Sequence, residues 1–222
     1  MFNYYYNQNL RKLVLGFGSL FSNLYVTHAN PDGGSDLTIR VPITYASQEK
    51  FIRRLLEPSS INDGIRVENQ LPRLSYIMTS LLPDSTRRRN RNTPLRSPNN
   101  GSCLNANIIT EEIPVNIGFS LYIYTRHIDD TLQIVEQIMP FFNPEHVINI
   151  GLNSAQTDLK IPIVMTSNNI SEKYDGDLSS RRVNISSFNF IAKSYIFGPV
   201  QNVTQISSIA IEGLTAGINL DF

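Results

Sequence analysis

Alternating apolar and polar positions predict several β-strands along the chain. Apolar residues occupy every second position in residues 37–45, 113–123 and 159–165. Because neighbouring side chains of a strand point to opposite faces of a sheet, this alternation is typical of strands with one buried face. Turn-forming residues at 30–36 predict that the first of these strands closes a hairpin. Weaker strand patterns cover 74–78 and 181–197, and a phase change in the latter predicts a bulge at Ser186-Ser187.

Helical spacing of apolar residues predicts an amphipathic helix near the N-terminus. The pattern is carried by Leu10, Leu13, Val14, Phe17, Leu20, Phe21 and Leu24. Gly16 and Gly18 lie inside it, and each costs about 1 kcal/mol relative to alanine in a helix. These two glycines therefore either permit the close approach of another backbone or break the helix.

Two further helices are predicted directly after strands. Ser47 is the expected N-cap of the first, which Pro58 ends, and its apolar side is formed by Phe51, Ile52, Leu55 and Leu56. Asp130 is the expected N-cap of the second, with Gln133 three residues later in a capping-box pattern. The apolar face of this helix, which Pro140 limits, is broad enough to predict burial on more than one side.

The order of these elements predicts an α+β fold, with a single mixed, mostly antiparallel sheet flanked by helices. No internal repeat or linker divides the chain, so residues 1–222 are expected to form one domain with a β-type C-terminal tail at 203–222. Proline lies between aliphatic residues at Pro42, Pro114 and Pro162. Because proline cannot donate a ladder hydrogen bond, each is expected at a strand start, a bulge or an edge.

Residues 83–102 are predicted to form a flexible basic loop. The stretch is rich in Pro, Asn, Ser and Thr, and its arginines are Arg87, Arg88, Arg89, Arg91 and Arg96. Three interpretations remain open: contact with nucleic acid phosphates, docking on an acidic patch of a protein partner, or a solvated loop. These five arginines are the candidate partner or channel contacts of the chain.

Composition limits the possible functions. The 222 residues hold 19 Lys+Arg and 19 Asp+Glu, and this zero net charge argues against a protein whose main task is coating nucleic acid. Charged residues make up 17% of the chain, below the roughly 25% of typical soluble domains, which suits packing against other subunits and is also compatible with an ordinary soluble monomer. The single Cys103 indicates a reducing compartment. No signal peptide or membrane span is recognisable, so a soluble protein made in the cytosol is expected.

No catalytic, cofactor-binding or metal-ligating residue is predicted. The three histidines and Cys103 do not share the spacing of a zinc site. Gly16-Phe17-Gly18 lacks the third glycine of a phosphate loop and does not follow a strand. Asp129-Asp130 is interpreted as a helix-capping pair rather than an acid–base couple, and Asp175-Gly176-Asp177 as a polar turn rather than a calcium loop.

Several segments together resemble the tail sheath stabiliser, or tail-completion, proteins of contractile-tailed bacteriophages of the T-even type. In chain order they are Phe2-x-Tyr4-x-Tyr6-Asn7, residues 20–23, Ile39-Arg40-Val41-Pro42-Ile43-Thr44-Tyr45-Ala46-Ser47, Thr125-Arg126-x-x-Asp129-Asp130-x-x-Gln133-Ile134-Val135-Glu136-Gln137-Ile138-x-Pro140-Phe141, and Asp175-Gly176-Asp177-Leu178-Ser179-x-Arg181-Arg182. None of them is a catalytic signature, and together they span most of the chain.

The resemblance implies a non-enzymatic virion subunit with a fold like that of phage tail terminators. Such a subunit would form a homo-hexameric ring at the tail–neck junction, assembled in the host cytoplasm. Its partners would be the tail tube protein, the contractile sheath protein and the neck or head-completion proteins. Genomic DNA would pass through the ring without sequence-specific binding, and no cofactor or membrane would be involved.

The chain departs from the family pattern in two places. Compared with the T-even version it is expected to lack the Pro- and acid-rich C-terminal extension, and its basic loop after Pro83 is matched to no segment there. Contacts that family members make through those two regions are therefore not expected of this chain on the basis of the resemblance. Two functions from other classes remain as alternatives: a nucleic-acid-binding module that uses the Arg87–Arg96 loop, and an enzyme whose site only the fold assembles.

Overall fold

The computed structural model describes residues 4–30, 35–56, 71–88, 95–99, 102–109, 112–151, 159–173, 183–198 and 200–204. Where the sequence predicts one domain, the chain divides into two compact units. The first comprises Met1–Arg88 and Glu112–Ile196, and the second comprises Arg89–Glu111 and Phe197–Phe222. No helix of the described part is long and apolar enough to cross a membrane.

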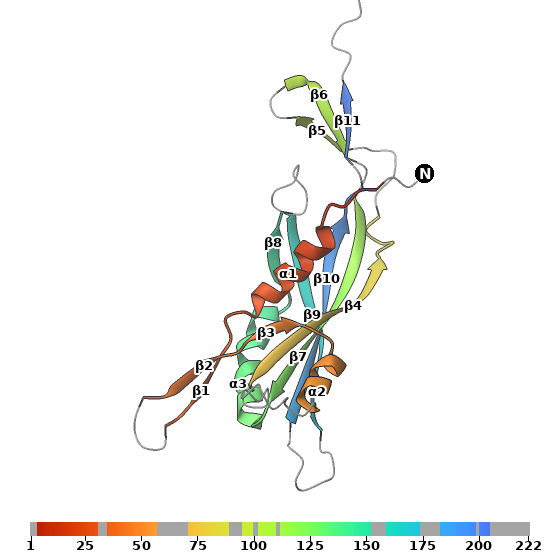
Figure 1. Ribbon diagram of the computed structural model, residues 1–222. Coiled ribbons are helices and arrows are strands. Elements are labelled where there is room, and N and C mark those ends of the chain that lie inside the picture. Colours follow the sequence, from red (N-terminus) through yellow and green to blue (C-terminus); the bar gives the residue numbers. More distant parts are fainter. Residues whose placement is uncertain are drawn as a thin grey trace, which may run out of the picture. The chain divides into compact units, whose positions relative to one another are not determined.

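A six-stranded sheet forms the centre of the first unit (Figure 1). Its strands lie in the order β3 (Ile43–Tyr45), β4 (Arg73–Pro83), β7 (Ile113–Thr125), β10 (Val183–Ile196), β9 (Leu159–Lys173) and β8 (His146–Ile150). Only β3 and β4 run parallel, and every other pair is antiparallel. This confirms the predicted α+β fold with a mixed, mostly antiparallel sheet.

Helices cover the two faces of this sheet unequally. On one face lie α1 (Asn9–Leu20), α3 (Ile128–Ile138) and the short 3-10 helix η2 (Met139–Phe142). On the other face, α2 (Gln48–Leu56) covers one end, where Phe51 stacks on Tyr124 with ring centroids 3.9 Å apart. We call the rest of that second face the open face.

An aromatic cluster fills the space between α1, η2 and the sheet. Phe17 of α1 is fully buried and stacks on Phe119 of β7, with 4.3 Å between ring centroids. Phe190 of β10 lies 5.5 Å from Phe17 and 4.8 Å from Phe142 of η2. Because neighbouring residues of a strand point to opposite faces, Tyr124 of β7 points to the other face of the sheet, where it contacts α2.

The predicted strand at 37–45 is wrong in its continuity and burial. It is divided into β2 (Leu37–Arg40), which pairs with β1 (Tyr25–His28) in a two-stranded hairpin, and β3, which joins the large sheet. The break falls at Val41-Pro42, where the missing proline N–H interrupts the ladder. All four residues of β2 are exposed, although the hairpin itself was predicted correctly.

The bulge predicted at Ser186-Ser187 is also wrong. The register of β10 against β7 has no irregularity, and the shift against β9 lies between Asn189 and Phe190. Ile185 and Phe188 are both buried because each face of the sheet is covered at its position. Ile185 packs with Phe51 under α2, whereas Phe188 lies on the face that α1 and η2 cover.

Several local predictions are confirmed. The helix of the N-terminal segment runs through Gly16 and Gly18 without a break. The Ser47 hydroxyl accepts a hydrogen bond from the Lys50 amide at the start of α2, whereas Pro58 lies outside the described residues. Pro114 is the second residue of β7, and Pro162 pairs with Val147 of the edge strand β8.

The second unit contains a three-stranded antiparallel sheet in the order β11-β6-β5. Its strands are β11 (Val200–Thr204), β6 (Ser102–Ile109) and β5 (Leu95–Asn99). Strand β5 falls within the stretch that the sequence predicts as a flexible loop. Of the predicted C-terminal tail, residues 205–222 lie outside the described part of the chain.

Candidate functional site

Surface contacts, rather than a reactive centre, are the prominent features of the first unit. Within the described ranges, no group of three or more His, Cys, Asp or Glu side chains is placed to hold a metal ion. His146 lies against the ring of Phe142 at 5.7 Å, and His127 is the N-cap residue of α3.

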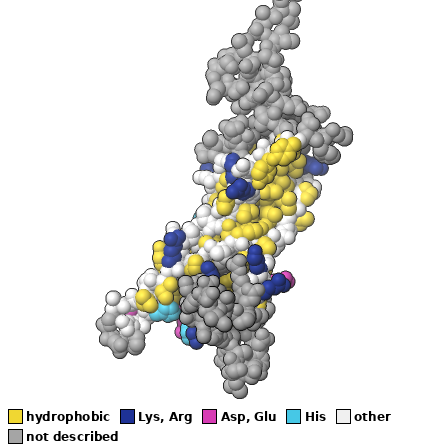
Figure 2. Space-filling model, in the orientation of Figure 1, with side chains coloured by type: hydrophobic (Ala, Val, Ile, Leu, Met, Phe, Trp, Pro, Cys, Tyr) yellow, Lys and Arg dark blue, Asp and Glu magenta, His cyan; other side chains and the backbone are white. Residues whose placement is uncertain are grey.

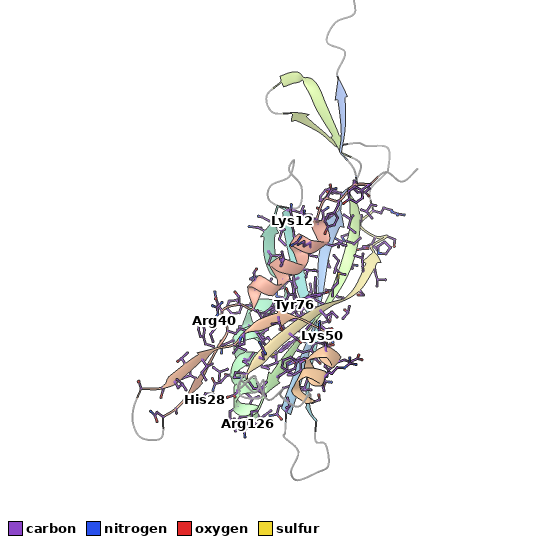
Figure 3. All side chains as sticks on the ribbon, viewed as in Figure 1. Lys12, His28, Arg40, Lys50, Tyr76 and Arg126 are labelled. Carbon is purple, nitrogen blue, oxygen red and sulfur yellow. The ribbon has the colours of Figure 1, made fainter. Side chains whose placement is uncertain are left out.

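Asp130 does not cap α3, which corrects the expected capping box. The helix begins at Ile128, and its N-cap residue His127 makes no side-chain capping bond. Asp130 instead lies buried in the first turn, with its Oδ1 atom 3.7 Å from Nε2 of His28. Figure 3 labels His28, which lies on the β1–β2 hairpin. Its carboxylate therefore faces the hairpin rather than the free amides of its own helix.

Two glutamines of α3 hold the hairpin in place. Gln133 accepts a hydrogen bond from the Thr27 amide (2.9 Å) and donates one to the Thr27 carbonyl (3.1 Å). Gln137 does the same with Tyr25, at 3.2 Å and 2.7 Å. The two side-chain amides lie one helical turn apart. They thus form the hydrogen bonds with the edge of β1 that a neighbouring strand would otherwise form. We call Gln133 and Gln137 the glutamine clamp.

Replacing either clamp residue with methionine is expected to loosen the hairpin. Each change removes two hydrogen bonds while keeping a side chain of similar length, so amide exchange at Tyr25 and Thr27 should rise about tenfold. Hydrogen exchange resolved by residue measures this directly. Glu136→Gln, on the exposed side of the same helix, should leave the exchange rates unchanged. If Gln133→Met also leaves the exchange rates at Tyr25 and Thr27 unchanged, Gln133 does not hold the hairpin.

The predicted arginines are not gathered into one described site. Arg87 is bound within its own unit: Nε donates to Asp84 (2.7 Å), Nη2 donates to Asn116 Oδ1 (2.9 Å), and the guanidinium lies 5.3 Å from the centre of the Tyr195 ring. Arg88 is exposed. Arg89 and Arg91 lie outside the described residues, and Arg96 belongs to β5. Partner contact through these arginines stays a prediction.

The Asp84 contacts predict a specific dependence of stability on pH. Hydrogen bonds from the Thr86 hydroxyl and then from Arg87 hold the pKa of the Asp84 carboxyl well below its usual range. In the unfolded chain this carboxyl has a pKa of about 4. Because its pKa is lower in the folded protein, the ionised carboxylate stabilises the fold at pH values above about 4, and this stabilisation is lost as the pH falls below that value. When thermal unfolding is measured between pH 7 and pH 2, the melting temperature of Asp84→Asn should therefore fall less on acidification than that of the natural chain.

The control is Asp36→Asn, a change at an exposed carboxyl near the hairpin. It should follow the natural chain at every pH. Equal acid profiles for Asp84→Asn and the natural chain would show that the Asp84–Arg87 contact does not stabilise the fold.

The outer side of α3 forms the first of two exposed surfaces. Ile128, Leu132 and Met139 are 38%, 45% and 44% exposed, although apolar helix positions are usually buried. The exposed carboxylates Asp129 and Glu136 lie between them, spaced along the same side of the helix. We call these five residues, of which Met139 is the first residue of η2, the outer stripe of α3. The helix is covered by the sheet on one side and by the β1–β2 hairpin on another, as predicted, whereas its outer stripe is exposed.

The open face of the large sheet is the second surface. Among its exposed or half-buried members, from four strands, are Leu82, Val147, Lys160, Val164, Ile191 and Lys193. Two positions before Ile191 on β10, Asn189 bridges Ser120 and Ser167 through hydrogen bonds of 2.7 and 3.0 Å. Figure 2 views the molecule from the side of α1 and shows that the helix-covered side also exposes many apolar atoms. Both faces of the sheet therefore present apolar surface.

Comparisons with known proteins agree with a surface-based role. The family model of the tail sheath stabiliser of T4-like viruses of the Myoviridae matches residues 4–218. The tail completion protein gp15 of Enterobacteria phage T4 is 33% identical over 219 residues, covering 91% of this chain and 75% of that relative. The resemblance noted in the sequence is thereby confirmed. This chain belongs to the family of tail sheath stabilisers of T4-like phages.

Proposed function

We propose that this chain forms a hexameric ring that ends the head-proximal side of the phage tail tube and contractile sheath and connects the tail to the neck. The observation that carries the proposal is the family match over residues 4–218, together with the relationship to a tail completion protein. A structural role in the virion tail follows from that membership. The hexamer, the location at the neck and the absence of catalysis are parts of the proposal.

The physical properties of the chain support a subunit of a closed assembly. Charged residues are few and the net charge is zero, so neighbouring copies repel one another little. The outer stripe of α3 and the open face provide apolar surface for contacts with other chains. In a cyclic ring every contact joins two different surfaces of the subunit, and the ring closes without leaving one free.

Within this proposal the ring surrounds the passage of the genomic DNA. Arg88, Arg89, Arg91 and Arg96 are proposed as contacts with the channel or with tail and neck partners. A contact with DNA would be made to the phosphates and would carry no sequence preference. Arg87 is assigned a smaller part, because its guanidinium is already bound to Asp84 and Asn116.

The test is complementation of a phage that lacks this chain. Without it, we expect tails whose sheath is lost or whose tube varies in length, and no joining of tails to heads. Supplying the purified chain should restore joining and place ring-shaped particles on tail ends in negative-stain images. A chain that stays monomeric and never binds tail ends would refute the proposal.

A further inference from the structure

The two exposed surfaces of the first unit differ in charge. The outer stripe carries two exposed carboxylates, Asp129 and Glu136, and no Lys or Arg. The open face carries Lys160 and Lys193, both exposed. Near its β4 edge Arg87 also reaches Asn116 and the Tyr195 ring, and the charge of Arg87 is offset by Asp84. By the strand register, no Asp or Glu occupies an open-face position of β4, β7, β8, β9 or β10 within the described residues.

The two surfaces also match in their apolar parts. The stripe offers Ile128, Leu132 and Met139, and the open face offers Leu82, Ile191 and Val147, which are 61%, 37% and 45% exposed. A patch that combines apolar contacts with opposite charges is the usual composition of a specific protein interface. A surface for DNA would instead concentrate Lys and Arg without these aliphatic side chains.

Their positions on the fold prevent contact within one subunit. Thr131 of α3 hydrogen bonds to Thr125, which places the helix on the face of β7 opposite to Tyr122 and Tyr124. The outer stripe points away from the sheet on that side, and the open face points the other way. Within the described residues of the first unit, the outer stripe and the open face therefore do not meet each other.

We propose that the outer stripe of α3 in one copy docks on the open face of the sheet in the next copy around the ring. This inference rests on the ring proposed above and names its two contact surfaces. The 11 residues of α3 span about 16 Å, which matches the width of about three to four strands spaced roughly 4.8 Å apart. The contact joins different surfaces, so repeating it gives a ring where the rotation between copies closes, and not a two-fold dimer.

Charge reversal provides the test. The sheet variant carries Lys160→Glu and Lys193→Glu, and the helix variant carries Asp129→Lys and Glu136→Lys. Each variant alone places like charges across the contact, so we expect at least a tenfold loss of rings in native mass spectrometry and of capped tail ends in images. A mixture of the two should restore rings in which the variants alternate at a 1:1 ratio, because each unlike pair regains opposite charges.

Controls separate the possible failures. Far-UV circular dichroism checks that both variants fold, and a third variant, Asp36→Lys with Glu49→Lys, reverses two exposed carboxylates outside both surfaces and should form rings normally. If both test variants form rings like the natural chain, or if their mixture stays dissociated, these surfaces do not meet and only this inference fails. If the natural chain forms no ring in solution or on tails, the proposed function fails with it.

A parallel experiment measures how strongly the natural chain and the sheet variant bind to immobilised duplex DNA, to test whether the open face contacts DNA. The natural chain and the sheet variant should be retained equally at low salt. If the sheet variant loses DNA binding while its rings persist, the open face contacts DNA and the inference is overturned.

Discussion

Replacing Phe17 with alanine is expected to lower the free energy of unfolding by about 3–5 kcal/mol. Phe17 is fully buried and contacts the rings of Phe21, Tyr76, Phe119 and Phe190. Its removal leaves a cavity between α1 and the sheet, because the surrounding rings belong to separate elements and cannot all move inward. Urea denaturation at a fixed protein concentration measures the loss.

Leu15→Ala on the same helix is the matched control. Leu15 is 60% exposed, so the same kind of truncation should change the unfolding free energy by no more than about 0.5 kcal/mol. Similar losses for the two variants would show that α1 does not pack through the side that carries Phe17.

Gly18→Ala is expected to destabilise the protein by about 2 kcal/mol, even though alanine favours a helix more than glycine does. A β-carbon at this position would lie 2.6 Å from Cζ of Tyr76 and would also overlap its hydroxyl oxygen. The Tyr76 ring is buried and is held between Phe17 and Tyr45, so it cannot swing away. Thermal and urea unfolding should both show the change.

Gly16→Ala separates the packing effect from helix propensity. Its β-carbon would meet mainly the terminal methyl of Ile150, 2.6 Å away, on the edge strand β8. This flexible side chain can rotate aside, so the gain of about 1 kcal/mol in helix propensity should leave the variant at least as stable as the natural chain. A Gly18→Ala protein that is also stabilised would contradict the tight packing of α1 on Tyr76.

The sequence predicts the elements whose burial follows their own periodicity. Strand β7 and helix α1 each have a regular apolar side, and each is found close to its expected position. Strand β10 is found as well, but its phase change reflects cover on both faces rather than a bulge. Local periodicity records which side of an element is buried, and it does not identify the element that covers it.

The candidate surfaces depend on contacts between residues far apart in the chain. Gln133 and Thr27 are 106 positions apart, and no local pattern marks their hydrogen bonds. The capping motif around Asp130 suggested a local partner, yet the carboxylate faces His28. The open face follows from the pairing of strands from distant parts of the sequence. The resemblance to tail sheath stabilisers supplied the functional class, which the residues alone left open.

An image reconstruction of complete tails tests the central claim most directly. With this chain identified in the density, we predict six copies in one ring, at the end of the tube and sheath that faces the head. Copies located at the baseplate end, distributed along the sheath, or present singly rather than as a ring would contradict it.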